Sequence, residues 1–152
     1  MTTVVELANA EATRDLGRRL GAAALAGDVV LLEGPLGAGK TVLVQGLAVG
    51  LECADAAASP TFVLVRHHAG RLPLVHADLY RLEDAPAVRR LGLLELAETG
   101  VLAVEWPDRD PGLAVDGVLH VALEQTPGRD DRRTLRVLAA PAHLARVLEA
   151  RG

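Results

Sequence analysis

The sequence predicts an α/β fold in which a mostly parallel, mixed sheet is flanked by helices. Apolar runs of strand length alternate with helical segments along much of the chain, and hairpin-like strand pairs accompany them. At 152 residues, with 50% hydrophobic and 24% charged residues, the chain has the size and composition of one domain with a substantial core. We therefore expect a single domain over residues 1–152.

The predicted strands are short runs rich in Val, Leu or Thr that are bounded by Gly, Pro, Asp or His. One turn at residues 68–71 and one loop at residues 126–131 would each join two of them into a hairpin. Strands are expected at residues 2–7, 28–34, 61–67, 72–78, 101–106, 116–125 and 132–140.

Helices are expected where periodic apolar positions follow a capping residue or a turn. Asn9 can cap a first helix over residues 10–26, with Gly27 just past its end. Further helices are expected at residues 41–51, at 84–99 with Gly92 as a candidate break, and at 141–152. The stretch at residues 107–112, PDRDPG, is expected to be a loop.

The stretch GPLGAGKT at residues 34–41 contains the only lysine of a chain that has fifteen arginines. It matches the pattern G-x-x-x-x-G-K-[ST] at every fixed position, and it stands between a predicted buried strand and a predicted helix. Its glycines allow positive φ angles, so backbone N–H groups can point inward and hold phosphate oxygens. Lys40 would bring a compact charge to the β- and γ-phosphates, and Thr41 would offer its hydroxyl to Mg²⁺. The sequence therefore predicts a P-loop NTPase fold.

Two acidic residues at the ends of predicted strands, Asp78 and Glu105, are candidates for the second metal-side acid of a P-loop site. Ligands of α/β sheets bind at the carboxyl ends of the strands, where both residues are expected. Ser59 and Thr61, in the segment SPTF, could sense the γ-phosphate or its metal as a switch does. A guanine site of the Asn-Lys-x-Asp kind would need a second lysine, so the sequence favours ATP.

Bulk properties argue against several classes of protein. The net charge is −4 and no basic run occurs, so tight and direct nucleic-acid binding is not expected. The single cysteine, Cys53, cannot form an internal disulfide. Neither an apolar run of about 18 residues nor a signal-peptide layout is present, so we expect a cytoplasmic protein without membrane contact.

Three features near the predicted site have a second interpretation. Strand alternation would place Trp106 on the face opposite Glu105, at the carboxyl edge of the sheet. His76 shares a strand face with Asp78 and could therefore aid the site, but a hydrogen-bonded structural histidine is the favoured interpretation. The run RDDRR at residues 129–133 is interpreted as a solvated hairpin tip.

Four motifs together resemble the TsaE family, formerly called the YjeE family. They are GPLGAGKT at residues 34–41, SPTF at 59–62, HADLYR at 76–81 and VEWPD at 104–108. The resemblance spans about residues 10–140. It implies a small Mg²⁺- and ATP-dependent P-loop ATPase that works with TsaD and TsaB in the bacterial synthesis of threonylcarbamoyladenosine in tRNA. TsaD carries the transfer chemistry, so the ATPase would regulate or reset the TsaD–TsaB complex and meet tRNA only indirectly.

The resemblance also implies roles for individual residues. Mg²⁺ would lie at Thr41 and Glu105, while Lys40, Asp78 and Thr61 would act at the γ-phosphate. The phosphates would rest on the loop formed by Leu36, Gly37, Ala38, Gly39, Lys40 and Thr41.

Adenine would lie near the N-terminal segment and the last hairpin, which places it at Thr13 and Arg133 by resemblance. The ATPase is expected to be a monomer when alone, slow by itself and dependent on its partners. Two other functions fit the residues: a P-loop kinase with a small-molecule acceptor, and a nucleotide switch with negligible turnover. A kinase would usually need an Arg-bearing lid, and the chain contains no long insertion to form one.

Overall fold

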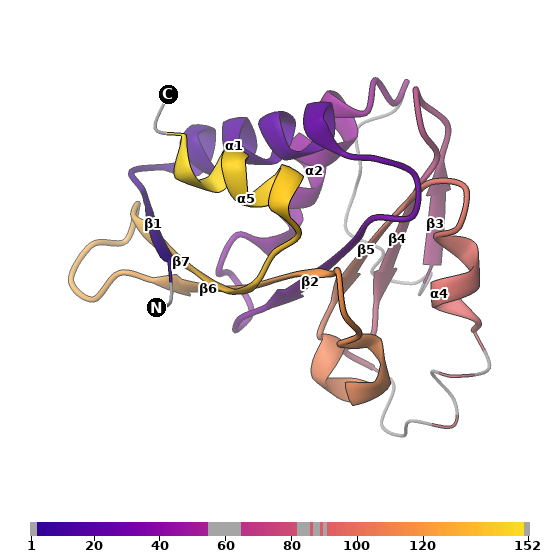
Figure 1. The fold of residues 1–152 in the computed structure, drawn as a ribbon. Helices are drawn as coiled ribbons and strands as arrows, with labels where there is room; N and C mark the ends of the chain where they lie inside the picture. Colours follow the sequence, from indigo (N-terminus) through magenta and orange to yellow (C-terminus); the bar gives the residue numbers. More distant parts are fainter. Residues whose placement is uncertain (1–2, 55–64, 82–85, 87–88, 90, 151–152) are drawn as a thin grey trace.

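A computed structural model describes residues 3–54, 65–81, 86, 89 and 91–150, and it confirms the α/β class with a seven-stranded mixed sheet (Figure 1). The strand order is β1-β7-β6-β2-β5-β4-β3. The strands are β1 (Thr3–Leu7), β2 (Val29–Glu33), β3 (Val65–His68), β4 (Leu74–Asp78), β5 (Val101–Glu105), β6 (Leu119–Gln125) and β7 (Arg133–Ala139).

The centre of the sheet is parallel and its margins are antiparallel. Strands β6, β2, β5 and β4 run in one direction, whereas β7 pairs antiparallel with β6, β1 with β7, and β3 with β4. The carboxyl ends of β2, β4 and β5 therefore meet at one edge of the sheet. At that edge Asp78 is the register partner of Glu105, and Glu105 is the register partner of Leu32.

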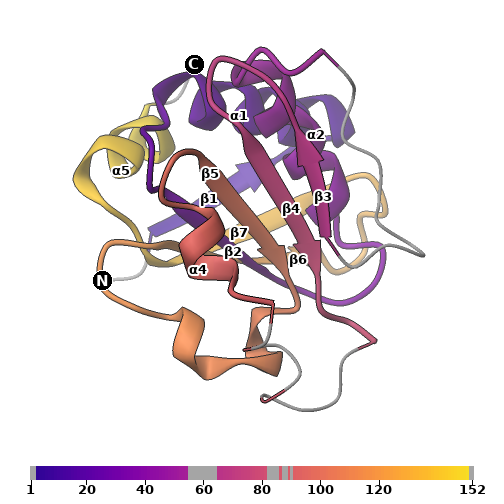
Figure 2. The same cartoon turned by 90° about the vertical axis from the view of Figure 1, so that its right-hand side faces the viewer.

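Helices cover both faces of the sheet. Helices α1 (Ala10–Ala23), α2 (Lys40–Gly50) and α5 (Ala142–Glu149) lie on one face (Figure 1). The short helix α4 (Leu93–Leu96) lies on the other face, together with the 3₁₀ turns η1 (Pro107–Arg109) and η2 (Pro111–Leu113) (Figure 2). No helix in the described part of the chain is long and apolar enough to cross a membrane.

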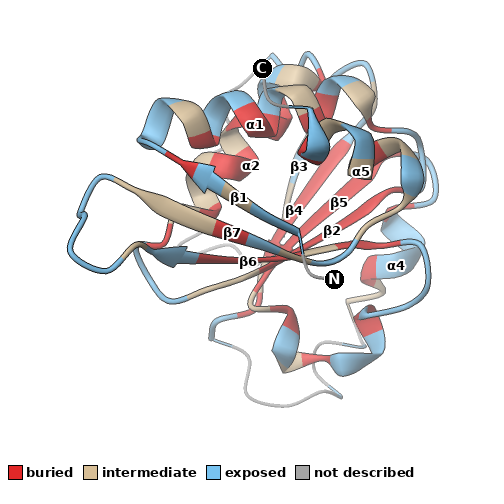
Figure 3. Ribbon diagram, turned by 60° about the vertical axis from the view of Figure 1, so that its left-hand side comes forward, coloured by how far each residue is buried: buried red, intermediate tan, exposed pale blue. Residues whose placement is uncertain are grey.

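Each face of the sheet carries its own apolar cluster. In β2, Val30 and Leu32 pack beneath α1 and α2, whereas Val29 and Leu31 pack toward α4 and η2. A strand covered on both sides reads as an unbroken apolar run, which is why residues 28–34 lack alternation. Figure 3 shows the result, with buried central strands and an exposed β1 at the margin.

Helices α1 and α2 pack with their backbones in direct contact. Gly17 and Gly21 of α1 face Gly46 and Gly50 of α2, and small residues four positions apart allow such close approach. A Cβ atom at Gly46 would overlap the carbonyl oxygen of Arg14, and it would lie 2.9 Å from the Cα of Gly17. This contact fixes α2, and with it the loop that precedes α2, against α1.

Helix α1 is shorter than the sequence predicts. It ends at Ala23 instead of residue 26. The Arg71 Nη2 atom, from the β3–β4 hairpin, donates to the carbonyl oxygens of Gly21 at 2.8 Å and Ala24 at 3.4 Å. Just past the helix end, the Leu25 N–H donates to the Asp28 carboxylate at 2.8 Å. The Arg71 contact comes from far along the chain and leaves no local sequence signal. At the other end, Asn9 caps the helix as predicted, accepting from the Ala12 N–H at 2.8 Å.

Other boundaries differ by a few residues. Gly92, with φ 61°, does break the predicted helix over residues 84–99, and α4 begins directly after it. Residues 82–85, 87, 88 and 90 lie outside the described residues, as do residues 61–64 of the predicted strand at 61–67. The expected loop at residues 107–112 contains the turns η1 and η2.

Candidate functional site

The glycine-rich loop joins the end of β2 to the start of α2, at the carboxyl edge of the sheet. Its glycines take the positive φ angles that the motif predicts: 144° at Gly34, 80° at Gly37 and 103° at Gly39. Helix α2 begins at Lys40 directly after the loop, so the N-terminal N–H groups of the helix join those of the loop. The segment thus forms a concave array of backbone donors of the kind that binds anions.

Lys40 is folded back into this loop. Its Nζ atom donates to the carbonyl oxygen of Gly34 at 2.5 Å, and it lies 3.8 Å from the centroid of the Trp106 ring. Only 4% of the residue is exposed. Burial lowers the pKa of the Lys40 ammonium group, and nearby carboxylates, Glu105 foremost, act in the opposite direction. The cation is therefore held at the bottom of the site by a carbonyl and an aromatic face.

Trp106 lies at the carboxyl edge of the sheet and close to the site, as predicted, and it packs against the apolar cluster on the face of α4. Strand β5 ends at Glu105, and Trp106 adopts a left-handed backbone with φ 60°, which turns its indole into the cavity. Its ring contacts Tyr80, with centroids 4.9 Å apart and the planes at 47°. Pro107 then opens η1. Strand alternation could not predict this arrangement, because the strand stops one residue earlier than expected.

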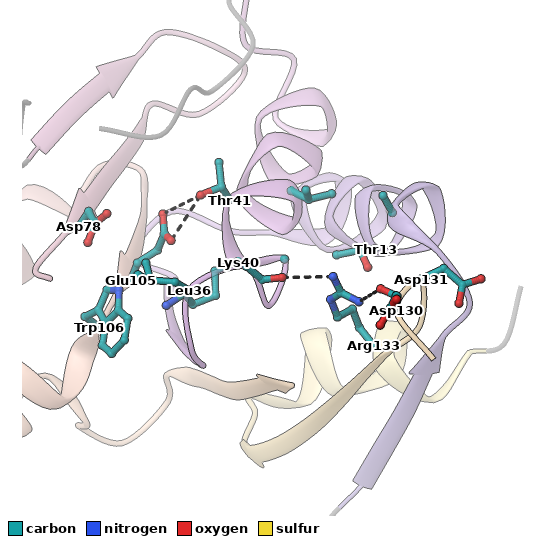
Figure 4. A pocket seen from close by; sticks show the side chains of 14 residues that line it. Thr13, Leu36, Lys40, Thr41, Asp78, Glu105, Trp106, Asp130, Asp131 and Arg133 are labelled. Carbon is teal, nitrogen blue, oxygen red and sulfur yellow. Dashed lines mark hydrogen bonds between the residues drawn. The ribbon is translucent and has the colours of Figure 1, made fainter. Parts of the chain in front are cut away.

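Two carboxylates face the start of α2. The Thr41 hydroxyl lies 3.5 Å from both carboxylate oxygens of Glu105, which is 3% exposed (Figure 4). Asp78 lies beside Glu105 in the sheet and lines the same cavity. Burial raises the pKa of the Asp78 carboxyl group and the Glu105 charge adds to this, while the Tyr80 N–H, which donates to Asp78 at 3.0 Å, opposes it.

A hydroxyl and a carboxylate in this arrangement suit a hard cation such as Mg²⁺, which prefers oxygen ligands. In the described ranges no group of three or more His, Cys, Asp or Glu residues forms a site that could hold a metal by itself. Thr41 and Glu105 would therefore supply part of a coordination shell, and phosphate oxygens and water would complete it. This donor set is the one expected for a metal that arrives with a nucleotide.

The far wall of the cavity comes from the two ends of the chain. Thr13 projects from α1, and the β6–β7 hairpin brings in Asp130, Asp131 and Arg133 (Figure 4). The Arg133 Nη2 atom donates to the carbonyl oxygen of Gly37 at 3.2 Å, which ties the hairpin to the loop. The hairpin tip is exposed as predicted, but it also forms a wall of the cavity, which its sequence did not reveal.

The structure thus gathers most of the predicted site residues around one cavity of about 500 Å³. The lining includes Thr13, Leu36, Gly37, Gly39, Lys40, Thr41, Asp78, Glu105 and Arg133. Ala38 is buried behind the loop and is not part of the lining. Ser59 and Thr61 lie outside the described residues.

A mixed, largely parallel sheet with this loop between β2 and α2, and with lysine and threonine at the helix start, defines the class of P-loop NTPases. The family model described as threonylcarbamoyl adenosine biosynthesis protein TsaE matches residues 7–135, most of the chain. The chain belongs to the TsaE family, as the four sequence motifs indicated.

Curated relatives and a solved structure agree with this assignment. The chain is 47% identical to a tRNA threonylcarbamoyladenosine biosynthesis protein TsaE from a Nostoc species, over 72% of this chain and 70% of the relative. It is 43% identical to the TsaE protein of Mycobacterium tuberculosis, over 83% of this chain and 81% of the relative. Among solved structures it resembles Bacillus subtilis YdiB, with a TM-score of 0.76 and 30% identity over 98% of this chain and 93% of that one.

Proposed function

We propose that this chain is a Mg²⁺-dependent ATPase that acts on a TsaD–TsaB complex during the formation of threonylcarbamoyladenosine in tRNA. One observation carries the proposal: the phosphate loop, the Thr41–Glu105 pair and the Thr13–Arg133 wall converge on a single cavity in a member of the TsaE family. By this proposal the chain meets tRNA only through its partners, in keeping with a net charge of −4 and the absence of a basic run.

The loop would hold the phosphates through its N–H groups, and Lys40 would leave the Gly34 carbonyl to contact the β- and γ-phosphates. Thr41 and Glu105 would hold Mg²⁺, which neutralises charge that develops on the phosphates. Asp78 lies at the same sheet edge with a carboxyl pKa raised by burial, and it would orient the attacking water and accept its proton.

The other end of the cavity would hold the adenine. Thr13 and Arg133 lie across the loop from Glu105, where a base extends once the phosphates occupy the loop (Figure 4). Arg133 is already fixed to the loop by its bond to the Gly37 carbonyl. A guanidinium group can stack on a purine face, which supports this assignment.

Hydrolysis measured alone and in the presence of TsaD and TsaB from the same source tests the proposal. We expect slow Mg²⁺-dependent ATP hydrolysis by the chain alone and faster turnover with both partners, because many P-loop proteins need groups supplied in trans. Tight nucleotide binding with negligible turnover in both conditions would indicate a switch instead. Transfer of the γ-phosphate to a small acceptor would indicate a kinase.

The two carboxylates are expected to differ when each is replaced by its amide. Glu105→Gln removes a metal ligand, so ADP binding in the presence of Mg²⁺ should weaken by at least about 10-fold. Asp78→Asn should largely spare ADP binding and lower turnover by about 10²-fold, because its place is near the γ-phosphate. Titration calorimetry with ADP and a non-hydrolysable ATP analogue, with and without Mg²⁺, measures the first effect, and steady-state hydrolysis measures the second.

Asp116→Asn, at an exposed position outside the cavity, is the control for loss of a carboxylate. It should behave as the wild type in both assays. If Asp78→Asn lost the metal-dependent binding and Glu105→Gln kept it, the two roles would have to be exchanged.

Trp106 is expected to report nucleotide binding. It is the only tryptophan, and the Lys40 ammonium lies 3.8 Å from its ring centroid. Movement of Lys40 toward phosphate would change the surroundings of the indole, so intrinsic fluorescence should change on addition of Mg²⁺-ATP, and less with GTP. The signal should vanish in Lys40→Ala. An unchanged spectrum at saturating nucleotide, with binding verified by calorimetry, would contradict this prediction.

A further inference from the structure

His76 is the most deeply buried polar residue beside the proposed metal site. It lies in the middle of β4, is 0% exposed, and does not line the cavity. By alternation it shares a strand face with Leu74 and Asp78, beneath α1 and α2. An imidazole in this layer takes the place of an apolar core side chain, and burying its polar atoms costs free energy unless they are hydrogen-bonded.

The single polar contact of His76 in the described part of the chain is with Glu105. Its Nε2 atom lies 2.7 Å from the Glu105 Oε2 atom, a short distance typical of a strong hydrogen bond. An ionised carboxylate can only accept, so Nε2 must carry the proton and donate it. The Nδ1 atom is buried and has no hydrogen-bond partner among the residues that the structure describes. Among those residues, the ring is therefore directed at one oxygen of one carboxylate.

The orientation of the Glu105 side chain has to satisfy two requirements. The side chain is only 4% exposed at the sheet edge, and its carboxylate must also face the Thr41 hydroxyl, 3.5 Å from both oxygens. A glutamate side chain has three torsion angles, so its carboxylate would adopt several orientations unless a hydrogen bond restrained it. His76 holds Oε2 at 2.7 Å, and in this orientation both oxygens of the carboxylate lie 3.5 Å from the Thr41 hydroxyl.

We infer that His76 is a positioning residue for Glu105: its Nε2–H group holds the Oε2 atom, which keeps the carboxylate beside Thr41 in the orientation that would receive Mg²⁺. The inference rests on the proposed Mg²⁺-dependent nucleotide binding. It assigns His76 no contact with nucleotide and no step of the reaction. Hydrogen bonds from such outer partners fix the ligand and commonly change metal affinity by about 10- to 100-fold.

The test compares two substitutions at position 76. His76→Leu fills the space without a donor, whereas His76→Gln keeps an amide N–H that can donate to Glu105. ADP binding is measured by calorimetry in EDTA and across a series of Mg²⁺ concentrations. We expect the leucine variant to need about 10- to 100-fold more Mg²⁺ for the same gain in ADP affinity. The glutamine variant should recover most of this loss, and all proteins should bind ADP equally in EDTA.

His143→Leu is the matched control. His143 Nε2 makes the same 2.7 Å contact with a carboxylate, Asp28 Oδ2, just before β2 and thus at the opposite end of that strand from the phosphate loop. This variant loses a histidine–carboxylate contact of the same length at a more exposed position, and its Mg²⁺ dependence should stay that of the wild type.

Several results would overturn the inference. A wild-type Mg²⁺ dependence in His76→Leu would do so, as would an equal loss of ADP affinity in EDTA, which would mark His76 as a purely structural residue. Failure of His76→Gln to recover any Mg²⁺ dependence would also count against it. If the wild-type protein itself showed no Mg²⁺-dependent nucleotide binding, the proposed function would fail together with the inference, and the wild-type titration distinguishes the two cases.

Discussion

Lys40→Ala is expected to reduce ATP hydrolysis in the presence of TsaD and TsaB by about 10²- to 10³-fold. The ammonium group is the one lysine charge in the chain, and it sits inside the loop at 4% exposure. Without it the β- and γ-phosphates would lose the cation that stabilises the negative charge developing on them in the transition state. Steady-state release of phosphate measures the effect, and circular dichroism checks that the variant is folded.

Lys40→Arg tests shape at constant charge. The Nζ atom fits between the Gly34 carbonyl at 2.5 Å and the Trp106 ring at 3.8 Å, and a planar guanidinium is too large for that space. We expect turnover close to that of the alanine variant. Arg129→Lys, at an exposed hairpin position, makes the reverse exchange as a control and should be neutral. Normal turnover by Lys40→Arg would show that lysine at this position is an accident of composition.

Gly46→Ala is expected to lower the free energy of unfolding by about 3 kcal/mol, an unusually large effect for one methyl group. On an isolated helix alanine would be favoured by about 1 kcal/mol over glycine. Here the new Cβ would overlap the Arg14 carbonyl and lie 2.9 Å from the backbone nitrogen of Arg18. Backbone atoms cannot rotate away, so the helices must separate. Chemical denaturation measures the change, and Tm should fall by roughly 6–12 °C.

Val49→Ala supplies the control on the same helix. Val49 is 52% exposed, so its truncation removes little buried surface from α2 and leaves the glycine contacts between α1 and α2 in place. Its effect should stay within about 0.5 kcal/mol. Equal stability of Gly46→Ala and the wild type would mean that α1 and α2 can move apart at little cost.

The fold class followed from local signals because most elements are locally encoded. The apolar run of β2, the Asn9 cap and the glycine-rich turns each depend on neighbouring residues, and each lies where the sequence predicts. Contacts between distant parts of the chain could not be predicted in this way. The carbonyl groups in the last turn of α1 accept from Arg71, about fifty residues away along the chain, and the sequence around Ala23 does not predict that contact.

The residues of the candidate site also fall into those that neighbouring sequence predicts and those that it does not. The phosphate loop is a contiguous motif, so its φ angles could be predicted residue by residue. Asp78 and Glu105 were found because strand ends in a parallel sheet share an edge. The contribution of the hairpin tip, Asp130 and Asp131, was missed, because charged residues at a turn look the same whether they face solvent or a cavity. For His76 a structural role was favoured over a role in the site, since its hydrogen-bond partner, Glu105, lies on another strand and could not be predicted from the neighbouring residues.

The pairing of β1 with β7 has a consequence for how the chain is made. Leu7 is the register partner of Arg133, so β1 cannot complete its pairing until β7, more than a hundred residues later in the sequence, has been made. Contacts between segments so far apart in the sequence form slowly, because a long loop must close first. The cavity wall formed by Thr13 and Arg133 would therefore be completed only when this pairing has formed. Nucleotide added during refolding should then accelerate the early steps little and stabilise the final closure of the sheet.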